Sequence, residues 1–403
     1  MKIFLGGVPF GCDNIGDEAI LASVIGVFRR ICPSAELVVC TGDREGTERK
    51  FGLKTAPLYG FAPTLSASCL AESLAGVDFY VWAGATGLSD YPEMACSLLE
   101  TVHAAGVRSI VWNVGMNDEF NPSFFTLGGP KRAFADKVRS ACGLDLARMW
   151  RERRIRAVRR RLARALSRCD LIVVRDPKSL ESLRRCAPFP DAVSGADTAI
   201  LQTQCRWDEL PWTDSERDAF ESASARMAVC ISNQNRIREF DAFADWLDTT
   251  LESRPGLLAV TLPMNPKKDY KVMLELRERS RHPDCILPLR FLEPEHVQAI
   301  AARCDLIVSS RLHLLILGLN NLVPGVGIAR GSKISDFISQ FGLVTAGSTD
   351  RLDLPVLTAA VESALTHRDE FRLRAKFVRA ELLADLEQAI GLLKQTLESS
   401  RRD

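Results

Sequence analysis

The feature that most constrains the fold is a regular alternation of short apolar segments with longer helical patterns along the chain. The short segments are near-continuous apolar runs, which are typical of parallel strands covered by helices on both faces. In the first half of the chain, strands are predicted at residues 2–8, 36–40, 78–83, 109–114, 170–174 and 191–194, with helices such as 17–31 and 93–105 between them. This β-α-β-α order predicts a doubly wound, mostly parallel sheet.

The alternation stops at residues 203–224, a polar stretch with two tryptophans that we interpret as a linker. A second series follows, with strands predicted at residues 227–231, 257–262, 284–287, 305–309 and 323–328, and a nearly unbroken helical pattern at 354–397. We therefore expect an α/β protein with two Rossmann-like doubly wound lobes, residues 1–202 and 225–350. We expect the C-terminal helical segment, residues 351–403, to pack across both lobes.

Composition excludes several classes of protein. The formal net charge is +1, so no global field attracts nucleic acid. The 12 cysteines include no CxxC pair and none at zinc-ligand spacing, so we expect free thiols, a reducing compartment and no metal site. No apolar run approaches the roughly 20 residues that cross a bilayer, and the first one is too short for a signal peptide. We expect a cytoplasmic protein.

The first candidate motif, Asn14-Ile15-Gly16-Asp17-Glu18, lies in the loop that opens the first predicted helix. Free amides at a helix start suit an anion, but acidic residues already satisfy the helix dipole there. We therefore assign these carboxylates to binding hydroxyl groups or to acting as a base. An ordinary capped turn is the alternative interpretation. The loop has neither the dinucleotide fingerprint nor a P-loop, so it does not support NAD or ATP binding.

The second candidate motif, Arg311-Leu312-His313, directly follows a predicted buried strand. Arginine offers a forked donor for a carboxylate or phosphate, and histidine can transfer a proton near neutral pH. The alternative is a salt-bridged arginine and a hydrogen-bonded core histidine. Residues 168–175 echo this pattern with a strand that ends at Arg175. Carboxyl ends of strands are where open α/β sheets bind ligands, which favours function for both arginines.

A third motif, Arg330-Gly331-Ser332-Lys333, lies in a turn between the last predicted strand and a helix. Free amides with two cations describe an anion site. The alternative is that Lys333 is a solvated residue in the first turn of the helix.

Together these segments resemble the polysaccharide pyruvyl transferase family. The resemblance rests on residues 14–21, on Arg175-Asp176 with Ser179 in the following helix, and most strongly on residues 310–313 with Val323-Pro324 and residues 334–342 downstream. It implies a two-lobed fold like that of GT-B glycosyltransferases. It also implies phosphoenolpyruvate as the donor, a sugar diol as the acceptor, and a pyruvate ketal and phosphate as products, in cell-surface or exopolysaccharide synthesis, with no cofactor.

The resemblance also suggests which residues act. The predicted catalytic residues are His313 as general acid, Arg311 as electrostatic clamp and Asp17 as base. The predicted donor-binding residues are Arg311, Arg330, Gly331, Ser332, Lys333 and Arg175. The predicted acceptor-binding residues, across the cleft, are Asn14, Gly16, Asp17, Glu18, Gly84 and Gly87. The family often has three consecutive glycines where this chain has Ala83-Gly84-Ala85. The two alanines are expected to narrow or reshape this loop and so to change which acceptor it binds.

Two other functions fit the same pattern. One is a nucleotide-sugar glycosyltransferase, whose C-terminal lobe would bind a diphosphate through Arg330, Gly331 and Lys333. The other is a non-catalytic sugar- or phosphate-binding relative, which the altered loop at residues 83–87 keeps open.

A basic helix is predicted at residues 146–170, with ten arginines from Arg148 to Arg168 and one acid, Glu152, before Asp170. A solvated surface helix is one interpretation. The other is peripheral contact with anionic lipid at the inner membrane face, or with a lipid-linked pyrophosphate acceptor. The chain has no recognisable nucleic-acid-binding pattern.

Overall fold

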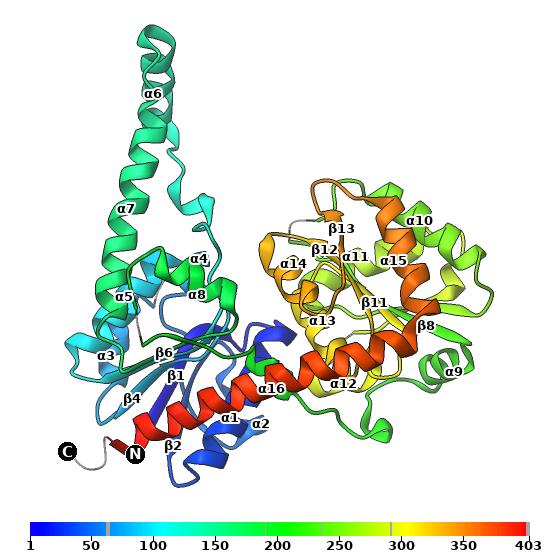
Figure 1. The fold of residues 1–403 in the computed structure, drawn as a ribbon, viewed down its shortest axis with the longest axis horizontal. Coiled ribbons are helices and arrows are strands. Elements are labelled where there is room, and N and C mark those ends of the chain that lie inside the picture. Colours follow the sequence, from blue (N-terminus) through cyan, green and yellow to red (C-terminus); the bar gives the residue numbers. More distant parts are fainter. Residues whose placement is uncertain (62–64, 190, 235, 291, 400–403) are drawn as a thin grey trace. The chain divides into compact units, whose positions relative to one another are not determined.

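The computed structural model describes residues 1–61, 65–189, 191–234, 236–290 and 292–399, and they form two compact units (Figure 1). The first unit contains Met1–Cys12, Gly26–Asp197 and Asp385–Asp403; the second contains Asp13–Ile25 and Thr198–Ala384. Helices α1 (Ile15–Ile31) and α16 (Arg368–Ser399) each contribute to both units. The sequence analysis placed residues 13–25 with the N-terminal lobe, whereas their contacts group them with the second unit.

The first unit is built on a seven-stranded sheet in which every recorded strand pair is parallel. Its order is β3-β2-β1-β4-β5-β6-β7. The strands are β1 (Lys2–Phe10), β2 (Glu36–Thr41), β3 (Lys54–Pro57), β4 (Phe79–Trp82), β5 (Arg108–Val114), β6 (Leu171–Val174) and β7 (Val193–Ser194). The strand order reverses between β1 and β4, as in a Rossmann fold.

Among its described residues, the first unit wholly contains the helices α2 (Arg44–Phe51), α3 (Leu70–Ser73), α4 (Gly87–Asp90), α5 (Pro92–Ala104), α6 (Gly129–Cys142), α7 (Leu146–Leu166) and α8 (Pro177–Arg184). Helix α7 covers most of the predicted basic helix at residues 146–170 but ends at Leu166, so Arg168 lies outside it. Its N-cap residue is Asp145, whose carboxylate accepts a hydrogen bond from the Arg148 amide. Short 3-10 turns occur at η1 (Ala67–Cys69) and η2 (Pro122–Phe125).

The second unit has a six-stranded parallel sheet of order β10-β9-β8-β11-β12-β13. The strands are β8 (Ala225–Cys230), β9 (Leu257–Thr261), β10 (Ile286–Pro288), β11 (Leu306–Ser309), β12 (Gly325–Ala329) and β13 (Thr345–Ser348). Its helices are α9 (Asp214–Ser222), α10 (Phe240–Glu252), α11 (Pro266–Arg279), α12 (Pro294–Ala301), α13 (Leu312–Leu319), α14 (Ser332–Ser339) and α15 (Leu354–Thr366), with 3-10 turns η3 (Thr198–Leu201), η4 (Trp207–Glu209) and η5 (Pro283–Cys285).

Two edge strands were not predicted from the sequence. Strand β3 reads Lys-Thr-Ala-Pro, and β13 reads Thr-Ala-Gly-Ser. Each pairs on one side with a longer apolar strand, so neither needs an apolar run of its own, and the terminal proline of β3 suits an edge position. The predicted linker also contains the helix α9, and the predicted C-terminal helical pattern divides into α15 and α16 at His367.

The two strands that echo each other in sequence occupy different positions. Arg175 follows β6 and Arg311 follows β11, so both lie at carboxyl ends of parallel strands. However, β11 pairs directly with the first strand of its sheet, as β4 does, whereas β6 lies two strands further out than β4. Only Arg311 is therefore adjacent to a point where the strand order reverses.

None of the described helices is long and apolar enough to span a membrane.

Candidate functional site

The carboxyl ends of β8 and β11 form the switch point of the second sheet, where open α/β sheets bind ligands. Two hydrogen bonds join the chain segments that leave these strands. The Ser232 amide donates to Ser310 Oγ at 2.9 Å, and the Ser310 amide donates to the Cys230 carbonyl at 2.9 Å. This pairing fixes the start of the segment that carries Arg311 and His313.

Arg311 is held by a fully buried carboxylate that the sequence analysis did not identify. Its Nε and Nη2 atoms donate to the two oxygens of Asp269 at 3.0 and 2.8 Å. The same oxygens accept the amides of Asn233 and Asn265, each at 3.0 Å. The Asp269 side chain is 0% exposed and that of Arg311 is 13% exposed. The ion pair proposed as the structural alternative for Arg311 is thus present, and it fixes the direction of the guanidinium.

The loop from Asn14 to Asp17 lies against His313 within the same unit. The Ile15 amide donates to the Met264 carbonyl at 3.0 Å, which attaches the start of α1 to the second unit. A Cβ atom built on Gly16 would lie 2.1 Å from His313 Nδ1, so glycine is required for the imidazole to pack here. The structure therefore brings together two motifs that the sequence analysis had assigned to different lobes.

Asp17 is a buried carboxyl group surrounded by cations. Burial raises its pKa above the ordinary value of 3.8, and four influences oppose this rise. They are the charge of His313, a hydrogen bond from Asn14, and the charges of Lys333 and Arg311. The Asn14 bond runs from Nδ2 to Asp17 Oδ2 and measures 2.7 Å. A carboxyl group with a raised pKa beside an imidazole is a suitable pair for proton transfer.

The Arg330–Lys333 turn joins β12 to α14. Gly331 has φ 148°, a conformation that favours glycine, although a Cβ atom there would meet nothing within 4 Å. Ser332 and Lys333 form the start of α14. Burial raises the pKa of the nearby Cys230 thiol to about 12, and the charges of Arg311 and Arg330 both act to lower it. This turn therefore adds the charges of Arg330 and Lys333 to the environment of Arg311.

The remaining predicted residue of the first motif, Glu18, follows Asp17 on α1 and is half-buried.

Arg175 belongs to the first unit and is also held by carboxylates. Its Nε donates to Asp176 at 3.1 Å and its Nη1 to Asp197 at 3.4 Å, and only 8% of the side chain is exposed. A Cβ atom on Gly115 would lie 2.6 Å from its Cζ atom. Asp176 also caps α8 by accepting the Ser179 amide at 2.6 Å. Strand-end location was thus predicted correctly, but the two acidic partners were not.

The two candidate glycines of the first unit lie in the loop after β4. Gly87 packs against the indole of Trp82, because a Cβ atom there would lie 2.6 Å from Trp82 Cζ2. Gly84 has φ 112°, and Ala85 has φ 57°, an unusual conformation for alanine. Close packing against Trp82 therefore explains why residue 87 has no side chain. The path of the loop before it depends on the positive φ angles of Gly84 and Ala85.

A polar cluster that the sequence analysis missed follows this loop. Asp90 accepts hydrogen bonds from the Thr86 hydroxyl and from Asn117 Nδ2, the latter at 2.9 Å.

Among the described residues, no group of three or more His, Cys, Asp or Glu side chains is arranged to hold a metal ion.

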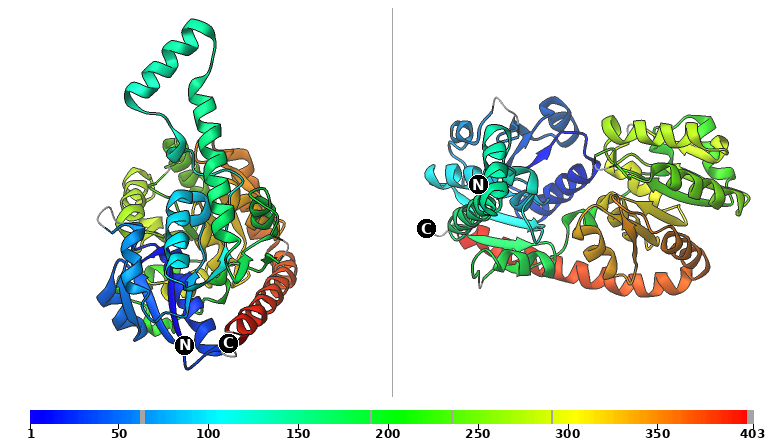
Figure 2. Two further views of the ribbon diagram at one scale, coloured as in Figure 1. Left: turned by 90° about the vertical axis from the view of Figure 1, so that its left-hand side faces the viewer. Right: turned by 90° about the horizontal axis from the view of Figure 1, so that it is seen from above.

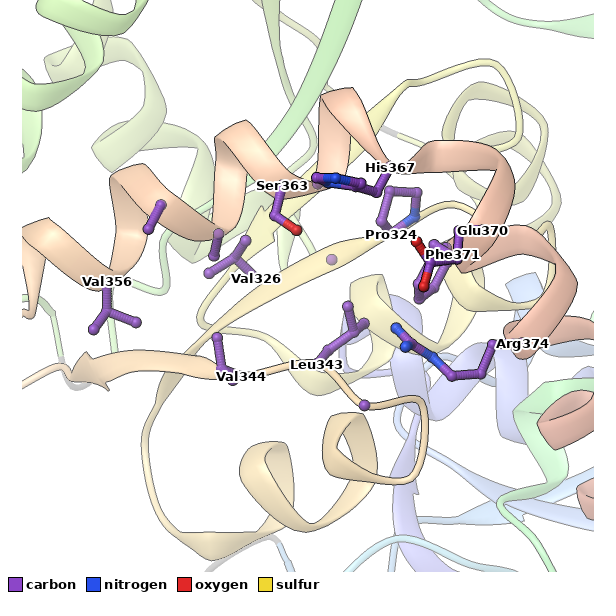
Figure 3. A pocket seen from close by; sticks show the side chains of 15 residues that line it. Pro324, Val326, Leu343, Val344, Val356, Ser363, His367, Glu370, Phe371 and Arg374 are labelled. Carbon is purple, nitrogen blue, oxygen red and sulfur yellow. The ribbon is translucent and has the colours of Figure 1, made fainter.

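A cavity of about 520 Å³ lies elsewhere in the second unit (Figure 3). It is bounded by the amino ends of β12 and β13 and by α15 and α16, with Val326, Leu343 and Phe371 among its apolar lining and His367 and Arg374 among its polar lining. Because the strands are parallel, these amino ends lie at the edge opposite to the one that carries Arg311. This cavity is therefore separate from the candidate site.

Solved structures with the same fold cover nearly the whole chain. UDP-GlcNAc 2-epimerase from Neisseria meningitidis, bound to UDP-GlcNAc, matches with a TM-score of 0.61 and 12% identity over 99% of this chain and 100% of that one. Anabaena HepE with UDP-glucose gives 0.59 and 11% over 99% and 100%, and S. aureus MnaA with UDP gives 0.59 and 12% over 97% of both chains. The predicted GT-B-like architecture of two Rossmann-like lobes is confirmed.

No curated protein gives a significant match to the sequence. The sequence model of the family described as "Polysaccharide pyruvyl transferase", in contrast, matches residues 14–332, from the Asn14 loop to the turn at Ser332. That span includes most of the chain and the motifs on which the resemblance was based, except for residues 334–342, which follow it. The chain therefore belongs to the polysaccharide pyruvyl transferase family.

Proposed function

We propose that the protein transfers the pyruvyl group of phosphoenolpyruvate to two hydroxyl groups of a saccharide, releasing phosphate and forming a ketal. The observation that carries this proposal is the cluster in the second unit. A buried Asp17 carboxyl group with a raised pKa lies within electrostatic reach of His313, Lys333 and Arg311, at the carboxyl edge of the sheet. Proton-transfer groups and anion-binding cations are thus concentrated at one place.

The reaction needs both kinds of group. A proton must reach the methylene carbon of the donor, which becomes the methyl group of the ketal, and a positive centre forms at the adjacent carbon. Two hydroxyl oxygens bond to that carbon as the C–O bond to phosphate breaks. Of the two hydroxyl protons released, one balances the proton delivered to carbon and the other leaves with phosphate. No oxidation or reduction occurs.

We assign delivery of the proton on carbon to His313 and acceptance of a hydroxyl proton to Asp17, since a carboxyl group with a raised pKa is a stronger base than an ordinary one. Arg311 uses its Nε–Nη2 edge for Asp269, so its Nη1–Nη2 edge is the one that would meet the donor carboxylate. Arg330 and Lys333 would meet the phosphate. Arg175, in the first unit, keeps its predicted donor role as part of this proposal.

Phosphate release from phosphoenolpyruvate tests the assignment, with methyl glycosides of glucose, galactose and mannose as acceptors. We expect His313→Gln and Asp17→Asn each to lower kcat at least about 100-fold, as for loss of a general acid or base. His367→Gln is the matched control, because His367 lines the separate cavity. Equal rates for His313→Gln and His367→Gln would reject the role of His313.

Thermal-shift measurements separate this proposal from its rivals. A ligand that binds only the folded state stabilises it by about 2.7 kcal/mol at 100 times its Kd. We expect stabilisation by phosphoenolpyruvate. The fold relatives bound to UDP and UDP-glucose make a nucleotide-sugar transferase the alternative. Stabilisation by UDP-glucose with indifference to phosphoenolpyruvate would establish that alternative, and binding of phosphoenolpyruvate without turnover of any acceptor would favour the non-catalytic relative.

A further inference from the structure

We propose that an exposed stripe of arginines on α7 binds the surface of an anionic lipid bilayer. Helices α6 and α7 form an arm that extends away from the sheet of the first unit (Figure 1, Figure 2). The buried residues of α7 are Val158, Leu162, Ala165 and Leu166, all in its second half. The outer half of the helix therefore contributes little to the core of the unit, so packing of the core does not determine its sequence.

Eight of the nine arginines of α7 fall into two groups, with Arg151 outside both, and the first group is used within the unit. Arg148 pairs with Glu152 at 2.8 Å on the same helix, and Arg154 pairs with Glu93 at 2.7 Å. Arg161 forms an ion pair with Glu100, and Arg159 lies 5.8 Å from the ring centre of Phe120. Three of these four side chains bind residues outside the helix, so their positive charge is explained by packing of α7.

The second group consists of Arg153, Arg156, Arg160 and Arg164, all of which are exposed. Their spacing of three, four and four residues puts them within about 80° of one another around a helix of 3.6 residues per turn. They span roughly 16 Å along its axis at 1.5 Å per residue. Within the described part of the chain, none of the four has a carboxylate at ion-pair distance. Four like charges thus lie in a row with no ion-pair partner among the described residues, and only Arg156 and Arg164 act on carboxylates at longer range, Glu152 and Glu100, so the row is suited to bind an external anion.

Exposed apolar side chains continue the same stripe toward the end of the arm. Met149, one turn before Arg153, is 54% exposed, and the adjacent Trp150 is 37% exposed. Leu144, in the turn between α6 and α7, is 47% exposed. Basic residues beside exposed tryptophan and leucine are typical of helices that lie at a membrane interface. A nucleic acid would explain the arginines and Trp150, on which bases can stack, but not the exposed Met149 and Leu144, so the combination favours a bilayer.

The experiment is vesicle flotation of the full chain, and it does not depend on the transfer chemistry. We expect the protein to float with phosphatidylcholine vesicles that contain about 30% phosphatidylglycerol, and to remain unbound with phosphatidylcholine alone. Each basic residue near an anionic surface contributes about a fivefold gain in partitioning. Replacing all four stripe arginines by Gln should therefore lower partitioning at least about 20-fold, even if only two contact lipid at once.

A matched control removes four exposed charges elsewhere on the first unit, by Arg49→Gln, Lys50→Gln, Lys178→Gln and Arg184→Gln. This control should float like the wild type, and both variants should keep the wild-type Tm, because the replaced side chains are exposed. Brominated lipids provide a second readout. They should quench the wild-type fluorescence, and Trp150→Phe should lose that quenching while still floating.

Three outcomes would overturn the proposal. The first is a wild-type protein that does not float with anionic vesicles at about 100 mM salt, a concentration at which the Debye length is about 10 Å. The second is equal flotation of the wild type and the stripe variant, or equal loss in the stripe and control variants. The third is stripe-dependent binding to duplex DNA with no binding to vesicles, which would identify the partner as a nucleic acid.

Discussion

Removal of the Arg311 side chain should destabilise the second unit as well as affect catalysis. Arg311→Ala leaves Asp269 with no cation, in a position that is 0% exposed. Breaking a buried ion pair by removing one partner costs about 3–5 kcal/mol. Asp269 keeps its two backbone hydrogen bonds, to Asn233 and Asn265, so the cost should be near the lower end, about 3 kcal/mol. For a domain of this size, that corresponds to a fall in Tm of roughly 6–12 °C.

A double-mutant cycle read by thermal denaturation tests this reasoning. Asp269→Asn removes the buried charge but keeps a side chain of the same shape. In the Arg311→Ala background it should therefore restore part of the lost stability, with a coupling energy of about 2 kcal/mol for residues in direct contact. The double variant should still be inactive if Arg311 also binds the donor. A Tm of Arg311→Ala within 2 °C of the wild type, or strictly additive effects, would refute the structural role assigned to the ion pair.

Three further predictions concern single residues. Gly16→Ala should lower stability by about 1–3 kcal/mol and reduce phosphate release, because its Cβ atom would clash with His313; unchanged Tm and rate would contradict this. Asp17→Asn should gain stability relative to the wild type as pH rises. The raised pKa of Asp17 means that the folded state binds its proton more tightly than the unfolded state, so this contribution is complete below pH about 4 and is lost as pH rises through the folded pKa. A Tm difference that is the same at pH 4 and pH 8 would show that the carboxyl group is not perturbed. Ala85→Gly should be neutral or stabilising by up to about 1 kcal/mol, since alanine at φ 57° is strained; a fall in Tm of several degrees would mean that the Ala85 side chain makes favourable contacts that outweigh the strain.

Much of the fold could be predicted because parallel strands covered on both faces must be apolar throughout. The central strands β1, β4, β8 and β11 were all identified from such runs, within a few residues of their observed ends. The edge strands β7 and β10 were predicted, whereas the edge strands β3 and β13 were missed because their sequences, Lys-Thr-Ala-Pro and Thr-Ala-Gly-Ser, contain no large apolar residue. Local patterns report burial, and burial falls off toward the edges of a sheet.

The partners of the site residues were less predictable, for a different physical reason. Asp269 is the fourth residue of α11, and its local sequence resembles an ordinary acidic first turn after an Asn cap. Asp269 and Arg311 are 42 residues apart in the sequence, and only the arrangement of β9 and β11 in the sheet brings them into contact. The same applies to Asp197, which pairs with Arg175. Each arginine was recognisable from its place after a strand, whereas each carboxylate depended on tertiary contacts that the spacing of residues does not encode.

The division of α1 between the two units explains why its first turn was difficult to interpret. Viewed as the start of a helix in the N-terminal lobe, Asp17 is an acid that occupies a potential anion site. Its surroundings in the structure belong to the second unit, through the Ile15–Met264 hydrogen bond and the contact of Gly16 with His313. In that environment the burial of the acid is opposed, because cations from two separate segments, Arg311–His313 and Lys333, lie near enough to act on it. The Asn14–Asp17 and Arg311–His313 motifs are thus in contact and form one candidate site, and the requirement for glycine at position 16 is the clearest physical sign of that contact.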